Sequence, residues 1–150
     1  MSMVDLDEAL KIIAENADQA WFAGPRDETL ILSAEHVLAG RLPPTYRAFV
    51  SSLGAGNFGA LEVYGVIDQE FGASTVPNGV WLTLNERREN GLPSEYAIIG
   101  SSGDGGWYCV ELGDQESPVF LHWAGAAPEP RQHIATDFGA FFLNGVREQI

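Results

Sequence analysis

The chain has 150 residues, of which 45% are hydrophobic and 19% charged, so we expect one globular domain with its own core and exclude a disordered chain. Asp and Glu number 21 against 8 Lys and Arg, for a formal net charge of -13. This balance disfavours direct nucleic-acid binding, because no basic patch is present to neutralise phosphates; it fits either plain solubility or attraction to a basic partner.

The first third of the chain is predicted to form two helices. Residues 5–22 place hydrophobic side chains at the helical period, with acidic residues in the first turn, where the helix dipole favours them. A glycine and a proline then break the pattern. A shorter helix follows over residues 33–40, with Ser33 as its candidate N-cap and Gly40 at its end.

A third helix is predicted from a pair of prolines at positions 43 and 44, which suit a first helical turn because they need no backbone N–H there. Its hydrophobic face follows at i, i+3, i+4 and i+7, and Gly54 closes it. The members of that face are Tyr46, Phe49, Val50 and Leu53. The run LEVYGV at 61–66 is β-branched and aromatic and predicts a strand.

The second half of the chain predicts a helix, three strands and a closing helix. Residues 80–90 form the helix, which ends at Gly91. The runs EYAIIG and GWYCVEL flank SSGDGG and predict a hairpin that turns at Asp104-Gly105, and VFLHWAG adds a third antiparallel strand. The closing helix has Thr136 as its candidate N-cap and a hydrophobic side formed by Phe138, Phe141 and Phe142.

The order of these elements predicts the fold class. Strands cluster in the middle of the chain and helices lie at both ends, which indicates an α+β fold with a single mixed or mostly antiparallel sheet. No internal repeat, linker or low-complexity tract divides the chain. We therefore expect residues 1–150 to form one domain.

Location and cofactors are predicted from features that the sequence lacks. No hydrophobic run approaches the roughly 20 residues needed to cross a bilayer, so we expect no membrane association. The N-terminal run MSMVDLDEALK has no signal-peptide pattern, which favours a cytoplasmic protein. Cys109 is a single cysteine, and no paired metal-ligand motif occurs, so we expect neither a metal nor another cofactor.

No catalytic group stands out in the sequence. SSGDGG leads into a strand and lacks the Lys of a phosphate-binding loop, so the hairpin turn is favoured. Cys109 and His122 would lie on opposite faces of the sheet if the loop between their strands is symmetric about Gln115, whereas a shift of one residue would put them on the same face. A buried, inert Cys109 is favoured. We therefore expect no enzymatic activity.

Acidic residues are the candidate partner-binding groups. One set lies on or beside two turns of the strand region, and the other lies in the first helix. A solvated surface is the plain alternative for both sets, and a basic partner would land on them by charge attraction. The candidates are Asp104, Glu111, Asp114, Glu116, Asp5, Asp7 and Glu8.

Ordered motifs along the chain resemble the SUKH superfamily. The run LPPTYRAFVSSLGAGNFG matches the family's Leu-Pro-x-x-Tyr-x-x-Phe helix and glycine-rich loop, through Leu42, Pro43, Tyr46, Phe49, Gly54 and Gly56. AIIGSSGDGGWYCVEL resembles its hairpin, VFLHWAG its next strand, and IATDFGAFFLNGV its closing Phe-rich helix. The resemblance covers nearly everything from Leu30 onward, and the region 67–80 fits least.

The resemblance implies an α+β fold and, in bacteria, a cytoplasmic immunity protein that neutralises a secreted toxin. Nucleases are among the toxins that such proteins neutralise, and the charge of -13 fits a basic nuclease. A fungal branch implies the alternative, a small regulatory or scaffold module related to regulators of cell-wall synthesis. The matched motif residues are mainly hydrophobic, Gly and Pro, so they set the fold and transfer no binding site.

Overall fold

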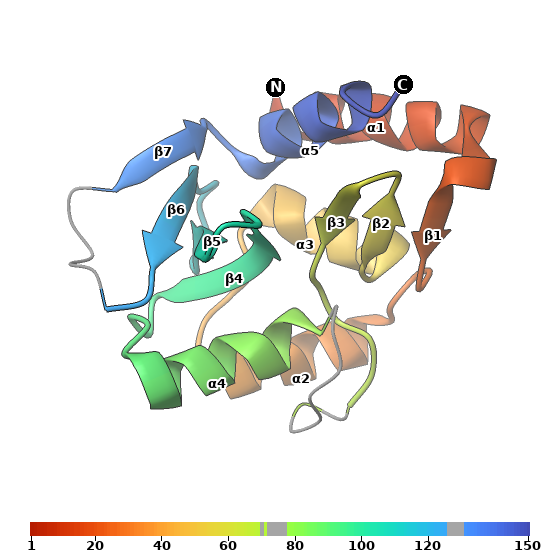
Figure 1. The fold of residues 1–150 in the computed structure, drawn as a ribbon. Coiled ribbons are helices and arrows are strands. Elements are labelled where there is room, and N and C mark those ends of the chain that lie inside the picture. The colour runs from red at the N-terminus through yellow and green to blue at the C-terminus, as the bar shows by residue number, and fades with distance from the viewer. Residues whose placement is uncertain (70, 72–77, 126–130) are drawn as a thin grey trace.

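The chain folds into helices packed around two separate antiparallel sheets (Figure 1). The structure is a computed structural model that describes residues 1–69, 71, 78–125 and 131–150. Half of the poorly matching region 67–80 lies outside these residues. The elements in order are α1 (Ser2–Glu15), the 3-10 turn η1 (Ala17–Gln19), β1 (Ala20–Phe22), α2 (Glu28–Leu38), α3 (Pro44–Leu53), β2 (Gly56–Phe58), β3 (Leu61–Val63), α4 (Gly79–Asn90), β4 (Tyr96–Ser101), β5 (Gly106–Glu111), β6 (Val119–Trp123), β7 (Gln132–Ala135) and α5 (Phe138–Arg147).

The prediction of a single sheet is wrong, although the α+β class is right. Strands β1, β2 and β3 form one three-stranded sheet in that order, and β4, β5, β6 and β7 form a four-stranded meander. Helices also fill the middle of the chain and not only its ends. In Figure 1, α5 runs along α1 on one side of the strands, while α4 runs along α2 on the other.

The two sheets part just after β3, at Tyr64. Its backbone N–H donates to Ile99 O in β4 (2.8 Å), but its carbonyl accepts the Tyr46 hydroxyl from α3 (2.7 Å). That carbonyl is thus bonded to a side chain of α3, while the N–H is bonded to β4. The next residue, Gly65, passes so close to the end of α3 that a Cβ on it would lie 1.9 Å from Gly54 O. The backbone therefore passes directly against the end of α3, where only glycine fits, and Gly65 bridges to Asn78.

Helix caps explain where the observed helices differ from the predicted ones. α1 begins earlier than expected, at Ser2, and also ends earlier, at Glu15. The last residues of the predicted helix, 20–22, form β1 instead. α2 begins after Asp27, whose carboxylate accepts Leu30 N (2.8 Å), and not at Ser33. α5 is capped by Asp137, the residue after the predicted Thr136, through a hydrogen bond from Ala140 N (2.9 Å).

The third and fourth helices and the hairpin are confirmed. α3 starts at Pro44 and ends at Gly54, which adopts a φ of 76°. α4 ends at Gly91 in the left-handed conformation. β4 and β5 pair antiparallel around the turn that holds Asp104-Gly105, and β6 pairs with β5. β1, β2 and β7 were not predicted.

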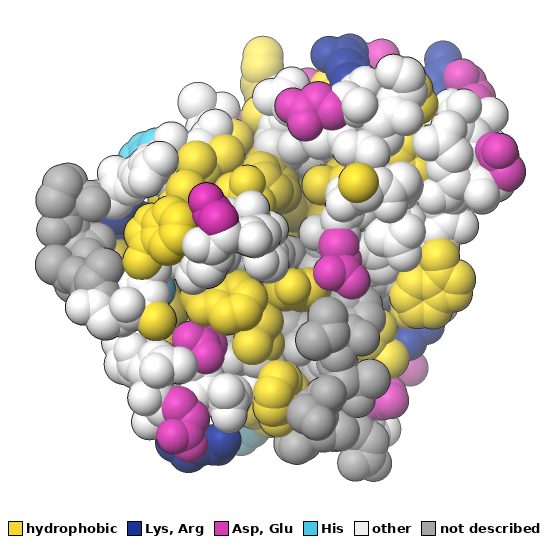
Figure 2. All heavy atoms as spheres, in the orientation of Figure 1, with side chains coloured by type: hydrophobic (Ala, Val, Ile, Leu, Met, Phe, Trp, Pro, Cys, Tyr) yellow, Lys and Arg dark blue, Asp and Glu magenta, His cyan; other side chains and the backbone are white. Residues whose placement is uncertain are grey.

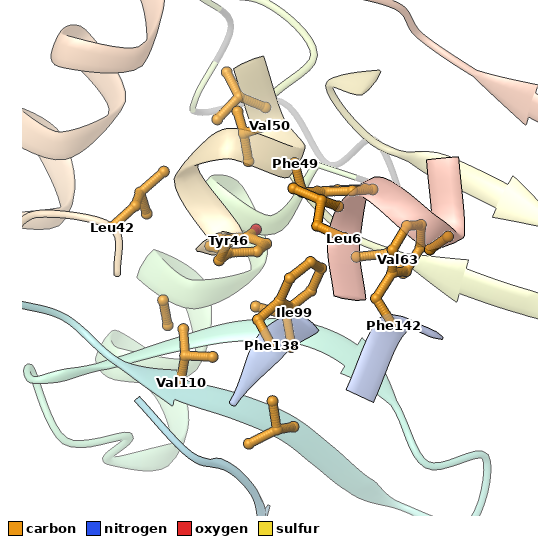
Figure 3. Close-up of a cluster of buried hydrophobic side chains, with 14 of the residues drawn as sticks. Leu6, Leu42, Tyr46, Phe49, Val50, Val63, Ile99, Val110, Phe138 and Phe142 are labelled. Carbon is orange, nitrogen blue, oxygen red and sulfur yellow. The ribbon is translucent and has the colours of Figure 1, made fainter. Parts of the chain in front are cut away.

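The main core lies between the sheets, where α1, α3 and α5 meet (Figure 3). The Phe49 ring of α3 packs 5.3 Å from Phe138 and 5.1 Å from Phe142, both of α5, measured between ring centroids. All three side chains are fully buried. Leu6 joins them from α1 and Val63 from β3. α3, which carries the Tyr-x-x-Phe part of the SUKH motif and is called the motif helix below, is thus the centre of the hydrophobic core.

The β5–β6 register differs by one residue from the symmetric loop. Cys109 faces Phe120, and Trp107 faces His122, so Cys109 and His122 share one face of the sheet. Within this asymmetric loop the Ser117 hydroxyl accepts Glu111 N (2.8 Å). The predicted opposite-face placement of this pair is therefore wrong.

Candidate functional site

A hollow opens between the two sheets, beside β3 and the β4–β5 hairpin. Two adjoining cavities of about 310 and 250 Å³ lie between β3, the β4–β5 hairpin, β7 and α5. Figure 2 shows hydrophobic side chains gathered near the centre of this face, with acidic side chains around them. We call this hollow the inter-sheet groove and define it by Leu61, Glu62, Tyr108, Phe141, Gly145 and Glu148.

An aromatic pair forms the floor of the inter-sheet groove. Tyr108 of β5 and Phe141 of α5 make an edge-to-face contact, with ring centroids 5.1 Å apart and an interplanar angle of 60°. Both side chains are half-buried. Gly145 brings α5 close to β3, since a Cβ there would lie 2.9 Å from the nearest Leu61 methyl carbon. These residues leave ring and aliphatic surface open to a ligand.

Carboxylates stand at the edge of the inter-sheet groove. Glu62 and Glu148 are both exposed, and neither pairs with a cation among the described residues. Asp104 lies in the β4–β5 turn beside Gly103, which lines the groove, and its carboxylate accepts the Ser102 hydroxyl. The groove therefore combines a hydrophobic floor with a negative edge, an arrangement that attracts a basic, partly hydrophobic group.

The structure divides the predicted acidic residues of the meander into two places. Asp104 lies at one end of β5, whereas Glu111, Asp114 and Glu116 lie at the other end or in the loop beyond it. The six residues of β5 separate the two turns by about 20 Å, at the usual rise along a strand. The acidic string is therefore not one continuous surface, and only its Asp104 end adjoins the inter-sheet groove.

The acidic residues at the far end of β5 make contacts within the fold. Glu111 forms an ion pair with Arg131. Glu116 accepts Thr45 N (3.2 Å) and the Thr45 hydroxyl at the start of α3. Asp114 lies 3.5 Å from Arg41, an exposed pair that contributes little to stability.

The predicted acidic residues of α1 differ among themselves. Glu8 pairs with Arg147 of α5 at 3.5 Å between exposed groups. Asp5 lies in the first turn and is half-buried, while Asp7 is exposed. Neither aspartate is paired with a cation of the described residues. Partner binding through α1 stays a prediction.

A buried acid that the sequence did not point to lies in α2. Glu35 is 6% exposed and accepts Leu42 N (2.8 Å) and Arg47 Nε (3.0 Å). Arg47 also pairs with Glu28, and these two hydrogen-bonded carboxylates raise the pKa of the guanidinium. Hydrogen bonding from Arg47 likewise lowers the pKa of Glu28. This network joins α2 to the motif helix. The positive charge of Arg47 is neutralised by Glu28 and Glu35 within the protein.

Cys109 and His122 share a face without forming a catalytic pair. Burial raises the pKa of the Cys109 thiol, whose hydrogen bond is a weak one to Trp107 O at 3.8 Å. Burial lowers the pKa of His122, whose ring packs edge-on against Tyr96 with centroids 5.8 Å apart. A protonated thiol without a hydrogen-bonded base is a poor nucleophile.

Two further features of the described part of the chain bear on function. Within residues 1–69, 71, 78–125 and 131–150, no group of three or more His, Cys, Asp or Glu side chains is placed to hold a metal ion. None of the helices seen there combines the length and apolar character that a bilayer crossing requires.

A family comparison identifies the relationship of this chain. The family model SUKH_5, described as SMI1-KNR4 cell-wall, matches residues 6–147. The chain belongs to the SUKH family. The resemblance seen in the sequence is thereby confirmed over nearly the whole chain. No curated protein matches it.

Membership in the SUKH family narrows the function to a class. It supports a role like that of an immunity protein or of a cell-wall regulator, and it favours a protein as the partner. It does not choose between these two roles.

The inter-sheet groove was not predicted, because its residues come from positions near 61, 108 and 141. Glu62 had the plain appearance of an outward-facing strand residue, and Phe141 that of a core residue of the closing helix.

Proposed function

We propose that this SUKH protein is a non-enzymatic immunity protein that binds one cognate toxin and blocks its active site or substrate groove. The inter-sheet groove carries the proposal, because a concave hydrophobic surface with exposed carboxylates at its edge suits a protruding basic segment of another protein. Family membership supports the same class of function.

A basic nuclease is the target class that fits best by charge. Such an enzyme carries cations that hold phosphates, and a protein with a net charge of -13 would be drawn to them. Glu62, Glu148 and Asp104 keep their charge available at the groove, unlike Glu35, which Arg47 neutralises. Binding there would cover the toxin's phosphate-binding surface.

Co-expression tests the proposal directly. Each toxin-like reading frame beside the gene is expressed in a host, with and without this protein, and survival is counted. We expect one frame to be toxic alone and harmless with the immunity protein present. If no neighbouring frame is toxic, or if toxicity persists in every pair, the proposal is wrong.

Salt dependence tests the electrostatic part separately. With the toxin in hand, the association rate is measured by stopped-flow fluorescence between 50 and 500 mM NaCl. We expect a decrease of about tenfold or more over this range, because salt screens charges that steer the encounter. An association rate that does not change with salt would contradict electrostatic steering but not the immunity function.

The family description favours a second candidate, a small regulatory module of the cell-wall type. Such a module would bind a host protein and not a toxin. Affinity purification from the native host distinguishes the two, since a regulator should recover proteins of cell-wall synthesis and an immunity protein should recover its toxin. Gene neighbourhood gives an independent answer, because an immunity gene should lie beside a large toxin gene.

A further inference from the structure

The protein already holds one of its own arginines on an aromatic pair, on the other face of the four-stranded sheet. Tyr96 and Phe120 pack edge-to-face with centroids 4.7 Å apart and an interplanar angle of 68°. The guanidinium carbon of Arg131 lies 5.0 Å from the Tyr96 centroid and 4.4 Å from that of Phe120. Glu111 completes the site through an ion pair with Arg131.

The inter-sheet groove repeats the parts of this site without the arginine. Tyr108 and Phe141 form an edge-to-face pair of similar geometry, 5.1 Å and 60°. Glu62 and Glu148 provide carboxylates beside it. No Lys or Arg is among the described residues that line the two cavities. Successive residues of a strand face opposite sides, so Tyr108 lies on the face opposite to that of Cys109 and Phe120.

We propose that the inter-sheet groove binds an arginine side chain of the partner protein, with its guanidinium over Tyr108 and Phe141 and paired with Glu62 or Glu148. The inference rests on the proposed function, since the arginine belongs to the toxin that the protein neutralises. The aliphatic part of that side chain contacts Leu61. Arginine anchors of this kind often dominate the affinity of a protein interface.

Arginine suits this groove better than lysine for a physical reason. A guanidinium is planar, stacks on aromatic rings and offers several N–H donors to a carboxylate at once. A lysine ammonium is a compact, strongly hydrated charge that gives up more hydration on entering a half-buried site. The Arg131 site shows the same sheet holding a guanidinium by these contacts.

Short peptides test the preference without knowledge of the toxin. Acetyl-Gly-Leu-Arg-Leu-Gly-amide and its lysine and citrulline analogues are titrated into the intact protein, followed by amide NMR shifts. We expect the shifts at Leu61, Tyr108 and Gly145, with arginine about three- to tenfold tighter than lysine and citrulline weakest. Equal affinity for citrulline, or shifts confined to other surfaces, would overturn the inference.

Substitutions at the groove provide the matched control. Glu62→Gln with Glu148→Gln should weaken binding of the arginine peptide about tenfold, because the guanidinium loses its carboxylate partners. Both changed groups are exposed, so we expect the variant to fold. Glu89→Gln with Glu95→Gln makes the same change of net charge at exposed sites outside the groove and should have little effect. Equal weakening by both pairs would show a general charge effect and refute a specific site.

The aromatic floor is tested with Tyr108→Leu, which keeps a hydrophobic side chain but removes the ring. We expect the preference for arginine over lysine to disappear, while thermal melting verifies that the variant is folded. If this variant does not fold, the pair of glutamate substitutions still decides the question. A retained preference in a folded variant would contradict the stacking contact.

The toxin separates failure of this inference from failure of the proposed function. If the wild-type protein neutralises the toxin and the Glu62→Gln, Glu148→Gln variant binds it equally well, the groove inference is wrong and the immunity function stands. If the wild-type protein neutralises no toxin, the immunity function is wrong, and the peptide titration alone decides whether the groove binds arginine.

Discussion

Tyr46 both fills the core and ties α3 to the backbone just after β3. Its ring packs edge-on against Phe138 with centroids 5.2 Å apart, and its hydroxyl donates to Tyr64 O at 2.7 Å. A buried carbonyl that loses its donor costs more than the hydrogen bond itself contributes, since water does not replace the donor. The motif tyrosine therefore has a polar role that its hydrophobic spacing alone did not predict.

Tyr46→Phe should lower the free energy of unfolding by about 1–2 kcal/mol, because it leaves the Tyr64 carbonyl without its hydroxyl donor. Urea unfolding followed by circular dichroism measures the change. Tyr64→Phe is the matched control, as it removes a hydroxyl from the neighbouring side chain and keeps the Tyr46 hydrogen bond. An unchanged urea midpoint for Tyr46→Phe would contradict the structural role.

His122 makes stability depend on pH in a predictable direction. Burial lowers its pKa below the ordinary value of 6.5, and the nearby Glu86 opposes that shift. Between the folded and unfolded pKa values, the unfolded state binds more protons. Stability from this group is therefore present above about pH 6.5 and decreases as the pH falls through that region.

His122→Phe should reduce the loss of melting temperature between pH 7.5 and 5.5, since no buried imidazole remains to be protonated. Differential scanning calorimetry at the two pH values measures this difference. His36→Phe removes an exposed histidine and is the control. Identical pH dependence in all three proteins would remove His122 as its source.

At the scale of elements, the loop between β5 and β6 caps the motif helix. The Glu116 carboxylate accepts Thr45 N at 3.2 Å, in the first turn of α3, where a negative group is favoured by the helix dipole. Thr45 is fully buried, so water does not reach its backbone N–H, and the Glu116 carboxylate is the acceptor instead. The loop and the motif helix therefore stabilise each other.

Glu116→Ala should lower the free energy of unfolding by about 1 kcal/mol, the usual cost of losing a helix cap. Asp114→Ala, two residues away, should change it by less than about 0.5 kcal/mol, because its ion pair with Arg41 is exposed. Chemical denaturation compares the two variants. Equal effects would refute a capping role for Glu116.

Elements with strong local signals were predictable, and elements defined by their partners were not. α3 carries its own start signal, stop signal and hydrophobic face, and the β4–β5 hairpin carries a recognisable turn. β1 and β2 have three residues each, too few to show a period, and they exist because they pair with each other. The inter-sheet groove has no local signal at all, since its lining comes from β3, the β4–β5 hairpin, β7 and α5.

At the scale of the whole molecule, the two terminal helices close the fold against each other. Gly139 of α5 lies so close to α1 that a Cβ on it would be 2.1 Å from Ser2 O, and its backbone N–H donates to the Ser2 hydroxyl at 3.1 Å. A backbone carbonyl is not able to move aside as a side chain does. Close contact of the helices therefore requires glycine at this position.

Gly139→Ala should destabilise the protein by about 1–3 kcal/mol, as expected for overpacking against a backbone. Gly145→Ala in the same helix is the control, because its new methyl group would meet the flexible Leu61 side chain and not a backbone atom. Thermal and urea unfolding measure both variants. A larger loss for Gly145→Ala than for Gly139→Ala would contradict the proposed helix contact.

The contact of α1 with α5 also limits how early the protein can fold during its synthesis. α1 is made first, but the surface that covers it is made about 130 residues later. A nascent chain on the ribosome therefore leaves the α5-facing side of α1 uncovered until α5 has been made and has left the exit tunnel. Contacts so distant in sequence slow folding, because a long loop must close before they form.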